Sequence, residues 1–72
     1  MSPVERNVAV IPLVDLERHL RAHGCVLLRQ GSRHTIWQNP SAQRRTSVPR
    51  HRQLPRTTAR LICSQLARPV IG

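Results

Sequence analysis

The sequence has no lysine, tyrosine or phenylalanine, and Trp37 is its single large aromatic residue. It also lacks a long hydrophobic run, since the apolar stretch Val8–Val14 is interrupted by Pro12. Such a stretch is too short for a membrane-spanning helix, and no basic, apolar and small-residue succession marks a signal peptide. With 72 residues the chain is expected to form one domain with one thin core.

Cysteine is scarce as well, because only Cys25 and Cys63 are present and they lie far apart in the sequence. Two cysteines make no disulfide framework, and no Cys-x-x-Cys motif occurs. We expect both to be small core residues in a protein of the reducing cytoplasm.

Acidic residues are the third shortage, with Glu5, Asp15 and Glu17 facing twelve basic residues that are all arginine. The net charge of +9 and the pI near 12.0 favour a polyanionic partner, with nucleic acid as the first candidate. Guanidinium groups suit phosphates and base edges. A membrane surface, an acidic protein, or a basic face that serves only solubility are the alternatives.

The hydrophobic spacing predicts an α+β fold in the order α-β-β-β-α. Leu13, Leu16 and Leu20 form one stripe of a helix over residues 12–24. Three short strands of an antiparallel sheet are expected at 25–30, 33–39 and 44–48, with a tight turn at Gly31-Ser32. The prolines that flank residues 49–56 favour a basic loop. A last helix, capped by Thr57 or Thr58, is expected to run to about Ala67.

Residues 1–10 are interpreted as an N-terminal extension, and disorder, a mis-assigned start or a short extra strand all remain open for them. Two helices on one face of the sheet would leave the other face open. We place Trp37 toward the helices, with Leu16, Leu20 and Leu61. The period of two then places His34 on the open face, together with Arg29 and Arg45. The inverse facing, with Ile36 toward the helices, is the alternative.

Several segments resemble the HicA-type toxins, which are small mRNA interferases of bacterial toxin–antitoxin pairs. The matching segments are Arg29-Gln30-Gly31-Ser32-Arg33-His34, Asn39-Pro40, Arg44-Arg45, Val48-Pro49-Arg50-His51 and 58–66. The resemblance covers residues 13–68, so residues 11–72 would form a single HicA-like RNA-cleaving domain.

The resemblance implies a fold similar to double-stranded RNA-binding domains, and RNA cleavage without a metal or other cofactor. It also implies a HicB-type antitoxin as the partner and mRNA as the substrate, while the short apolar run already argues against membrane association. The histidine that the family requires corresponds by position to His34. Many members carry two adjacent histidines after Gly-Ser, whereas this sequence has Arg33 in the first of those places.

The chemistry of RNA cleavage fits this histidine, because the 2′-hydroxyl can serve as nucleophile and an imidazole can move its proton near neutral pH. Arginine can stabilise the negative charge that develops on phosphorus. His34 is therefore the candidate catalytic residue, and the candidate RNA-binding residues are Arg29, Ser32, Arg33, Arg45, Arg50 and His51. His51 could also be a second proton carrier or a structural residue.

A non-catalytic binder of double-stranded nucleic acid is the competing prediction, since a binder needs the charge but not the imidazole. A module for an acidic protein partner is a third. A metal site at His19, His23 and Cys25 is disfavoured because no fourth ligand is placed by the sequence. With a single aromatic residue, sharp base preference is not expected.

Overall fold

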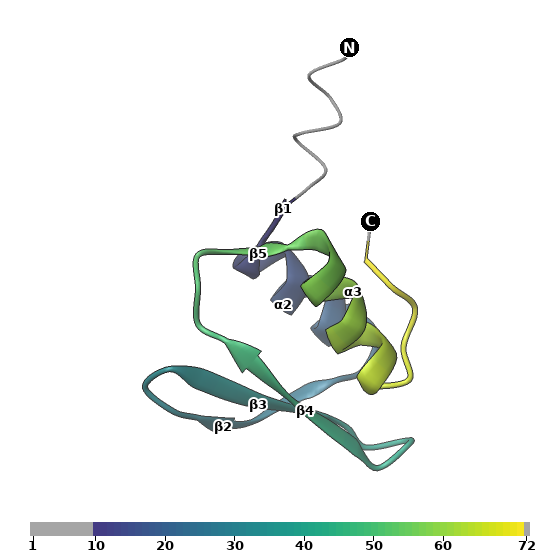
Figure 1. The fold of residues 1–72 in the computed structure, drawn as a ribbon. Coiled ribbons are helices and arrows are strands. Elements are labelled where there is room, and N and C mark those ends of the chain that lie inside the picture. The colour runs from purple at the N-terminus through teal and green to yellow at the C-terminus, as the bar shows by residue number, and fades with distance from the viewer. Residues whose placement is uncertain (1–9, 72) are drawn as a thin grey trace.

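The computed structural model describes residues 10–71, which form two helices, a three-stranded sheet and a separate strand pair. The elements follow in the order β1 (Val10–Pro12), α2 (Leu13–Ala22), β2 (Val26–Gln30), β3 (His34–Asn39), β4 (Arg44–Pro49), β5 (Gln53–Pro55) and α3 (Arg56–Gln65). Both helices lie on the same side of the β2-β3-β4 sheet, and the other side is open (Figure 1). The expected α+β class and its resemblance to the double-stranded RNA-binding fold are confirmed. None of the described helices is long and apolar enough to cross a membrane.

Helix α2 follows its sequence pattern closely. Leu16 and Leu20 are completely buried on its inner face, and Asp15 lies in its first turn. Pro12 precedes the helix, and Gly24, at φ +84°, ends the turn after it. A positive φ at this place is the left-handed C-terminal conformation that glycine adopts without strain.

Helix α3 corrects the expected N-cap. It begins at Arg56, directly after Pro55 and without a side-chain cap, so neither Thr57 nor Thr58 caps it. Proline is favoured at a helix start because its fixed φ already suits the first turn. The helix ends at Gln65, with Leu66 as its C-cap, close to the expected end at about Ala67.

Leu61 was expected in the core, but 56% of its surface is exposed. The other residues expected on the buried side of α3 are buried, namely Ala59, Ile62, Cys63 and Leu66. These positions recur at steps of three and four, whereas Leu61 lies about 100° around the helix from Ile62. Trp37 is therefore completely buried without a contribution from Leu61 to the core.

The three-stranded sheet is an antiparallel meander in which β3 is the central strand. Thr35 and Trp37 face the helices and are buried, and the indole Nε1 of Trp37 donates to the Thr35 hydroxyl at 3.1 Å. The guanidinium of Arg21 lies 5.1 Å from the centroid of the Trp37 ring. The predicted facing of β3 is thus confirmed, and the inverse facing is wrong.

A second, two-stranded pair lies at the ends of the helices. β1 pairs antiparallel with β5, with Ile11 opposite Leu54, and the amide of Leu13 donates to the carbonyl of Arg52 at 2.9 Å. The expectation of a loop throughout 49–56 is therefore wrong, since part of it is strand β5. At Val10 the alternative of a short extra strand is confirmed, while the prediction for residues 1–9 lies outside the described residues.

Asn39, at the end of β3, ties the sheet to α3. It is only 1% exposed, and its Nδ2 donates to the carbonyl of Leu66 at 2.7 Å. Its Oδ1 accepts from the amide of Ser41 at 3.2 Å and from the guanidinium of Arg68 at 2.9 Å. One amide side chain thus satisfies three groups from different segments.

Candidate functional site

The open face of the sheet presents His34 at the start of β3. His34 is exposed, in agreement with the prediction, and it lies opposite Pro49 of β4. Ile36 follows two residues later on the same face, opposite Ser47. Val48, opposite buried Thr35, points toward the helices, while Arg45 and Ser47 are exposed, as the period of two predicts.

The turn before His34 is held by a close backbone contact. The amide of Gly31 donates to the carbonyl of His34 at 2.8 Å. A Cβ added at Gly31 would lie 3.0 Å from that same carbonyl oxygen, which is closer than side chains ordinarily approach. Glycine therefore relieves a tight contact here, so that the turn can close directly against the histidine.

Arg50 fastens the turn from the neighbouring strand. Its Nη1 donates to the carbonyl of Gly31 at 2.7 Å, and its backbone amide donates to the carbonyl of Arg33 at 2.9 Å. Arg50 was predicted as an RNA contact, and the structure adds a positioning role that local sequence patterns did not reveal. These two hydrogen bonds fix the position of Arg50 and leave its other guanidinium N–H groups for further contacts. They also join the turn before His34 to the residue that follows β4.

A β-bulge sets the direction of the side chains on β2. Leu27 lies opposite Trp37 and Arg29 lies opposite Ile36, so Leu28 is one extra residue in β2. In such a bulge two residues face one partner residue. The alternation is interrupted, and Leu28 and Arg29 both come to lie beside Ile36 on the open face. Arg29 thus faces outward as predicted, although the bulge, rather than plain alternation, places it there.

Three shallow hollows follow one another over this face. The turn hollow, of about 280 Å³, is lined by Arg29, Gly31, Ser32, Arg33, His34 and Ile36. The loop hollow, of about 420 Å³, is lined by Ser32, Arg33, His34, Pro49, Arg50 and His51. The sheet hollow, of about 590 Å³, is lined by Leu28, Arg29, Ile36, Arg45, Thr46 and Ser47.

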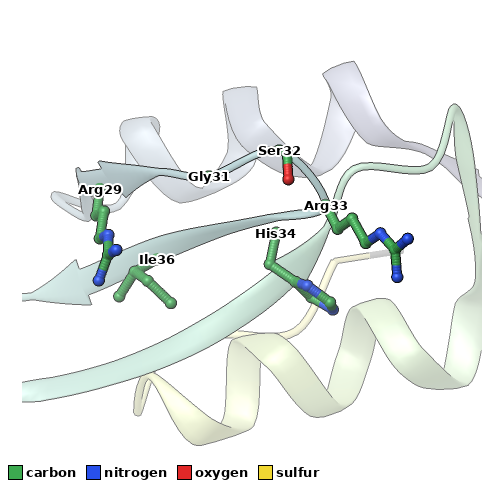
Figure 2. Close-up of a pocket in the computed structure, with 6 residues that line it drawn as sticks. All are labelled: Arg29, Gly31, Ser32, Arg33, His34 and Ile36. Atoms are coloured by element: carbon green, nitrogen blue, oxygen red, sulfur yellow. The ribbon is translucent and has the colours of Figure 1, made fainter.

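His34 lines both the turn hollow and the loop hollow, and Arg29 and Ile36 connect the turn hollow to the sheet hollow. Figure 2 shows Arg29 beside Ile36 and the imidazole of His34 projecting from the same strand, with the Arg33 guanidinium on the side away from Arg29. The predicted residues Arg29, Ser32 and Arg33 therefore meet at His34. Arg50 and His51 join it from the loop hollow, while Arg45 lies apart, in the sheet hollow.

The charge on the described part of this face is of one sign. Among residues 10–71 the only carboxylate side chains are Asp15 and Glu17, and both belong to α2. Asp15 pairs with Arg18 of the same helix at 3.7 Å. Within residues 10–71 no acidic side chain therefore neutralises the arginines of the open face, which suits them to a polyanion.

The remaining basic residues of the 44–56 segment are more dispersed. Arg44 and Arg52 are exposed, whereas Arg56 is half-buried at the start of α3. None of the three lines the hollows beside His34. The basic side chains of residues 44–56 therefore do not form one cluster, since some lie on the open face and Arg56 lies at the start of α3.

The candidate metal ligands lie elsewhere. The rings of His19 and His23 are 4.5 Å apart, and Nε2 of His19 is 2.7 Å from the carbonyl oxygen of Pro69. Cys25 is buried in the core, where desolvation raises its pKa even though Arg68 acts in the opposite direction. Within the described residues no three metal-ligating side chains gather.

Comparison with known proteins gives one family. Residues 14–67 match the family described as the HicA toxin of bacterial toxin–antitoxin systems. No curated protein and no solved structure matches the chain. The match covers three-quarters of the sequence. It includes the buried faces of both helices, the turn before His34 and the end of β4. The chain therefore belongs to the HicA family of toxins.

Proposed function

We propose that this toxin is a metal-independent endoribonuclease that cleaves mRNA, with His34 as its general acid and base. The observation that carries the proposal is an exposed imidazole at the junction of two hollows, with three arginines around it and, in the part of the chain that the structure describes, no carboxylate beside it. The family provides the toxin role. The ribonuclease activity and the role of His34 rest on the motif and on this geometry.

The proposed reaction uses the substrate's own 2′-hydroxyl. His34 takes the proton from this hydroxyl, and O2′ attacks the adjacent phosphorus. The bond from phosphorus to the 5′-oxygen breaks, which leaves a 2′,3′-cyclic phosphate on one product. The departing oxygen takes a proton from the imidazolium or from water, so that it ends as a 5′-hydroxyl.

The arginines supply the charge stabilisation in this proposal. Arg29 and Arg33 line the turn hollow with His34, and their paired donors suit the oxygens of a phosphorane. Ser32 and His51 add donors at the border of the loop hollow. Arg50, whose Nη1 is bound to Gly31, holds the turn and offers its other donors to a phosphate.

Membership of the family implies an antitoxin partner. We propose that a HicB-type antitoxin with an acidic surface covers the open face and thereby blocks His34. The mRNA substrate places the action of the toxin in the cytoplasm.

The test is cleavage of an mRNA in the presence of EDTA. We expect the wild-type protein to cut the RNA, and His34→Ala to lose activity by at least about 100-fold, the range of one general acid–base group. RNA affinity and the melting temperature should be retained, since His34 is exposed. His23→Gln, which alters a histidine in the helix layer, is the matched control and should cleave normally.

The competing proposal is a non-catalytic nucleic-acid binder using the same arginines. Intact RNA that shifts on a gel with both wild-type protein and His34→Ala would support the binder and overturn the nuclease. Undiminished cleavage by His34→Ala would likewise remove the proposed role of this residue. Detection of 2′,3′-cyclic phosphate termini distinguishes the proposed chemistry from metal-dependent hydrolysis.

A further inference from the structure

The sheet hollow differs from the two hollows at His34 because its floor is hydrocarbon. Leu28 is 46% exposed and lies beside half-buried Ile36 on the open face. Arg29 from β2 and Arg45 from β4 flank this floor from the two outer strands. A phosphate needs donors and gains nothing from an aliphatic floor, so charge alone does not account for this hollow.

The β-bulge is what builds the floor. A regular strand would set one side chain of β2 opposite Ile36, whereas the bulge sets both Leu28 and Arg29 there. An aliphatic surface and a guanidinium therefore occupy the same rung of the sheet. A flat, apolar ring with a polar edge is the kind of group that fits such a place, because guanidinium planes stack on nucleobases.

The distance from the candidate catalytic residue fits a nucleotide. His34 and Ile36 are two residues apart on the same face of β3, which corresponds to about 7 Å along the strand. The turn hollow and the sheet hollow also share Arg29 and Ile36, so the surface between them is continuous. A phosphate at His34 would bring the base of an adjoining nucleotide over the sheet hollow.

We propose that the sheet hollow seats one unpaired nucleobase of the RNA, against Leu28 and Ile36 and between the guanidinium groups of Arg29 and Arg45. The inference rests on the proposed function and names its substrate class, which is single-stranded RNA. A base that is stacked and paired inside a duplex cannot enter the hollow. No amide or carboxylate side chain of the described residues lines the hollow, so base identity is read weakly.

The binding test uses two RNA mimics that the protein cannot cut, because 2′-O-methyl groups replace the nucleophile. One is a short 2′-O-methyl oligouridylate, and the other has the same sugar-phosphate backbone without bases. Their charges are equal, so a difference in Kd measures the bases alone. We expect the oligouridylate to bind wild-type protein roughly 5- to 150-fold more tightly, the range for one stacked base.

The double variant Leu28→Thr/Ile36→Thr should lose this preference while it binds the base-free oligomer as the wild-type protein does. Threonine keeps the strand propensity, and Leu28→Thr alone is the second variant should the double variant unfold. The matched control is Val14→Thr/Leu61→Thr, which alters two exposed apolar residues on the helices. This control should retain the full preference.

Equal affinities of the wild-type protein for the two oligomers would overturn the inference, and the hollow would then serve a protein side chain or nothing. A preference that survives in Leu28→Thr/Ile36→Thr would overturn it as well. Cleavage of unmodified RNA is measured separately. Cleavage without a base preference defeats this inference alone, whereas a base preference without cleavage defeats the proposed nuclease and leaves the base site standing.

Discussion

At the scale of single residues, two glycines do different work. Gly24 has a positive φ and open space around it, so its constraint is conformational. Gly31 is instead confined by the carbonyl oxygen of His34, at 3.0 Å from where a Cβ would stand. The first glycine therefore serves the fold, and the second serves the geometry of the candidate site.

Alanine substitution should separate these roles. Gly24→Ala should lower the free energy of unfolding by about 1 kcal/mol, through strain in the left-handed region, and leave RNA cleavage intact. Gly31→Ala should reduce cleavage by about tenfold or more, because the turn must move away from His34. Urea unfolding and cleavage rates of both variants provide the measurement. Equal effects of the two variants on cleavage would contradict this assignment.

The predicted placement of His34 on the open face is confirmed at this scale, while its catalytic role stays a prediction. Its exposure follows from one alternation, in which Trp37 faces the helices and His34 faces away. The bond from Arg50 to Gly31 could not be predicted, because it joins residues 19 apart through a register that the sequence does not display. Side-chain-to-backbone contacts of this kind depend on the assembled sheet.

At the scale of elements, both helices and the three strands of the sheet lie close to their predicted ranges, whereas the pairing of β1 with β5 was not predicted. The stripe of Leu13, Leu16 and Leu20 predicted α2, and the turn at Gly31-Ser32 separated β2 from β3. β1 and β5 have three residues each and pair across more than 40 residues, so no local period reveals them. The bulge in β2 was hidden by Val26, Leu27 and Leu28, three consecutive apolar residues without alternation.

Asn39 gives a test of how the elements are joined. Asn39→Ala should lower the free energy of unfolding by about 2–3 kcal/mol, because the Leu66 carbonyl and the Arg68 guanidinium both lose a buried partner. Gln38→Ala, the neighbouring change toward the open face, should cost less than about 0.5 kcal/mol. Urea unfolding compares the two variants. A small effect of Asn39→Ala would show that water replaces its bonds.

At the scale of the whole molecule, the composition lets the titration of the two buried thiols be observed separately from that of other side chains. Burial raises the pKa of Cys25 and of Cys63 above the ordinary value of 9.0. The chain has no lysine and no tyrosine, so no other side-chain type titrates near these thiols above neutral pH. The pH dependence of the free energy of unfolding in the alkaline range therefore reflects the two core thiols.

The sign follows from proton binding. Above pH 9 the unfolded thiols lose protons that the folded thiols keep, so the unfolded state is favoured as the pH rises. We expect the free energy of unfolding to be constant below this range and to fall by up to about 1.4 kcal/mol per pH unit for each thiol above it. Urea unfolding between about pH 7.5 and pH 10 measures the slope. The variant Cys25→Ala/Cys63→Ala should show a much flatter profile, and an unchanged slope would contradict the prediction.

The extra residue in β2 also affects whether copies of the protein associate through their sheet edges. β2 is an edge strand with Val26, Leu27 and Leu28 all partly exposed, which is the type of edge that invites another strand to pair. A bulge interrupts the ladder and increases the local twist, so a straight incoming strand cannot follow the whole edge. The bulge that places Leu28 on the open face therefore also protects the exposed edge strand β2 against edge-to-edge aggregation.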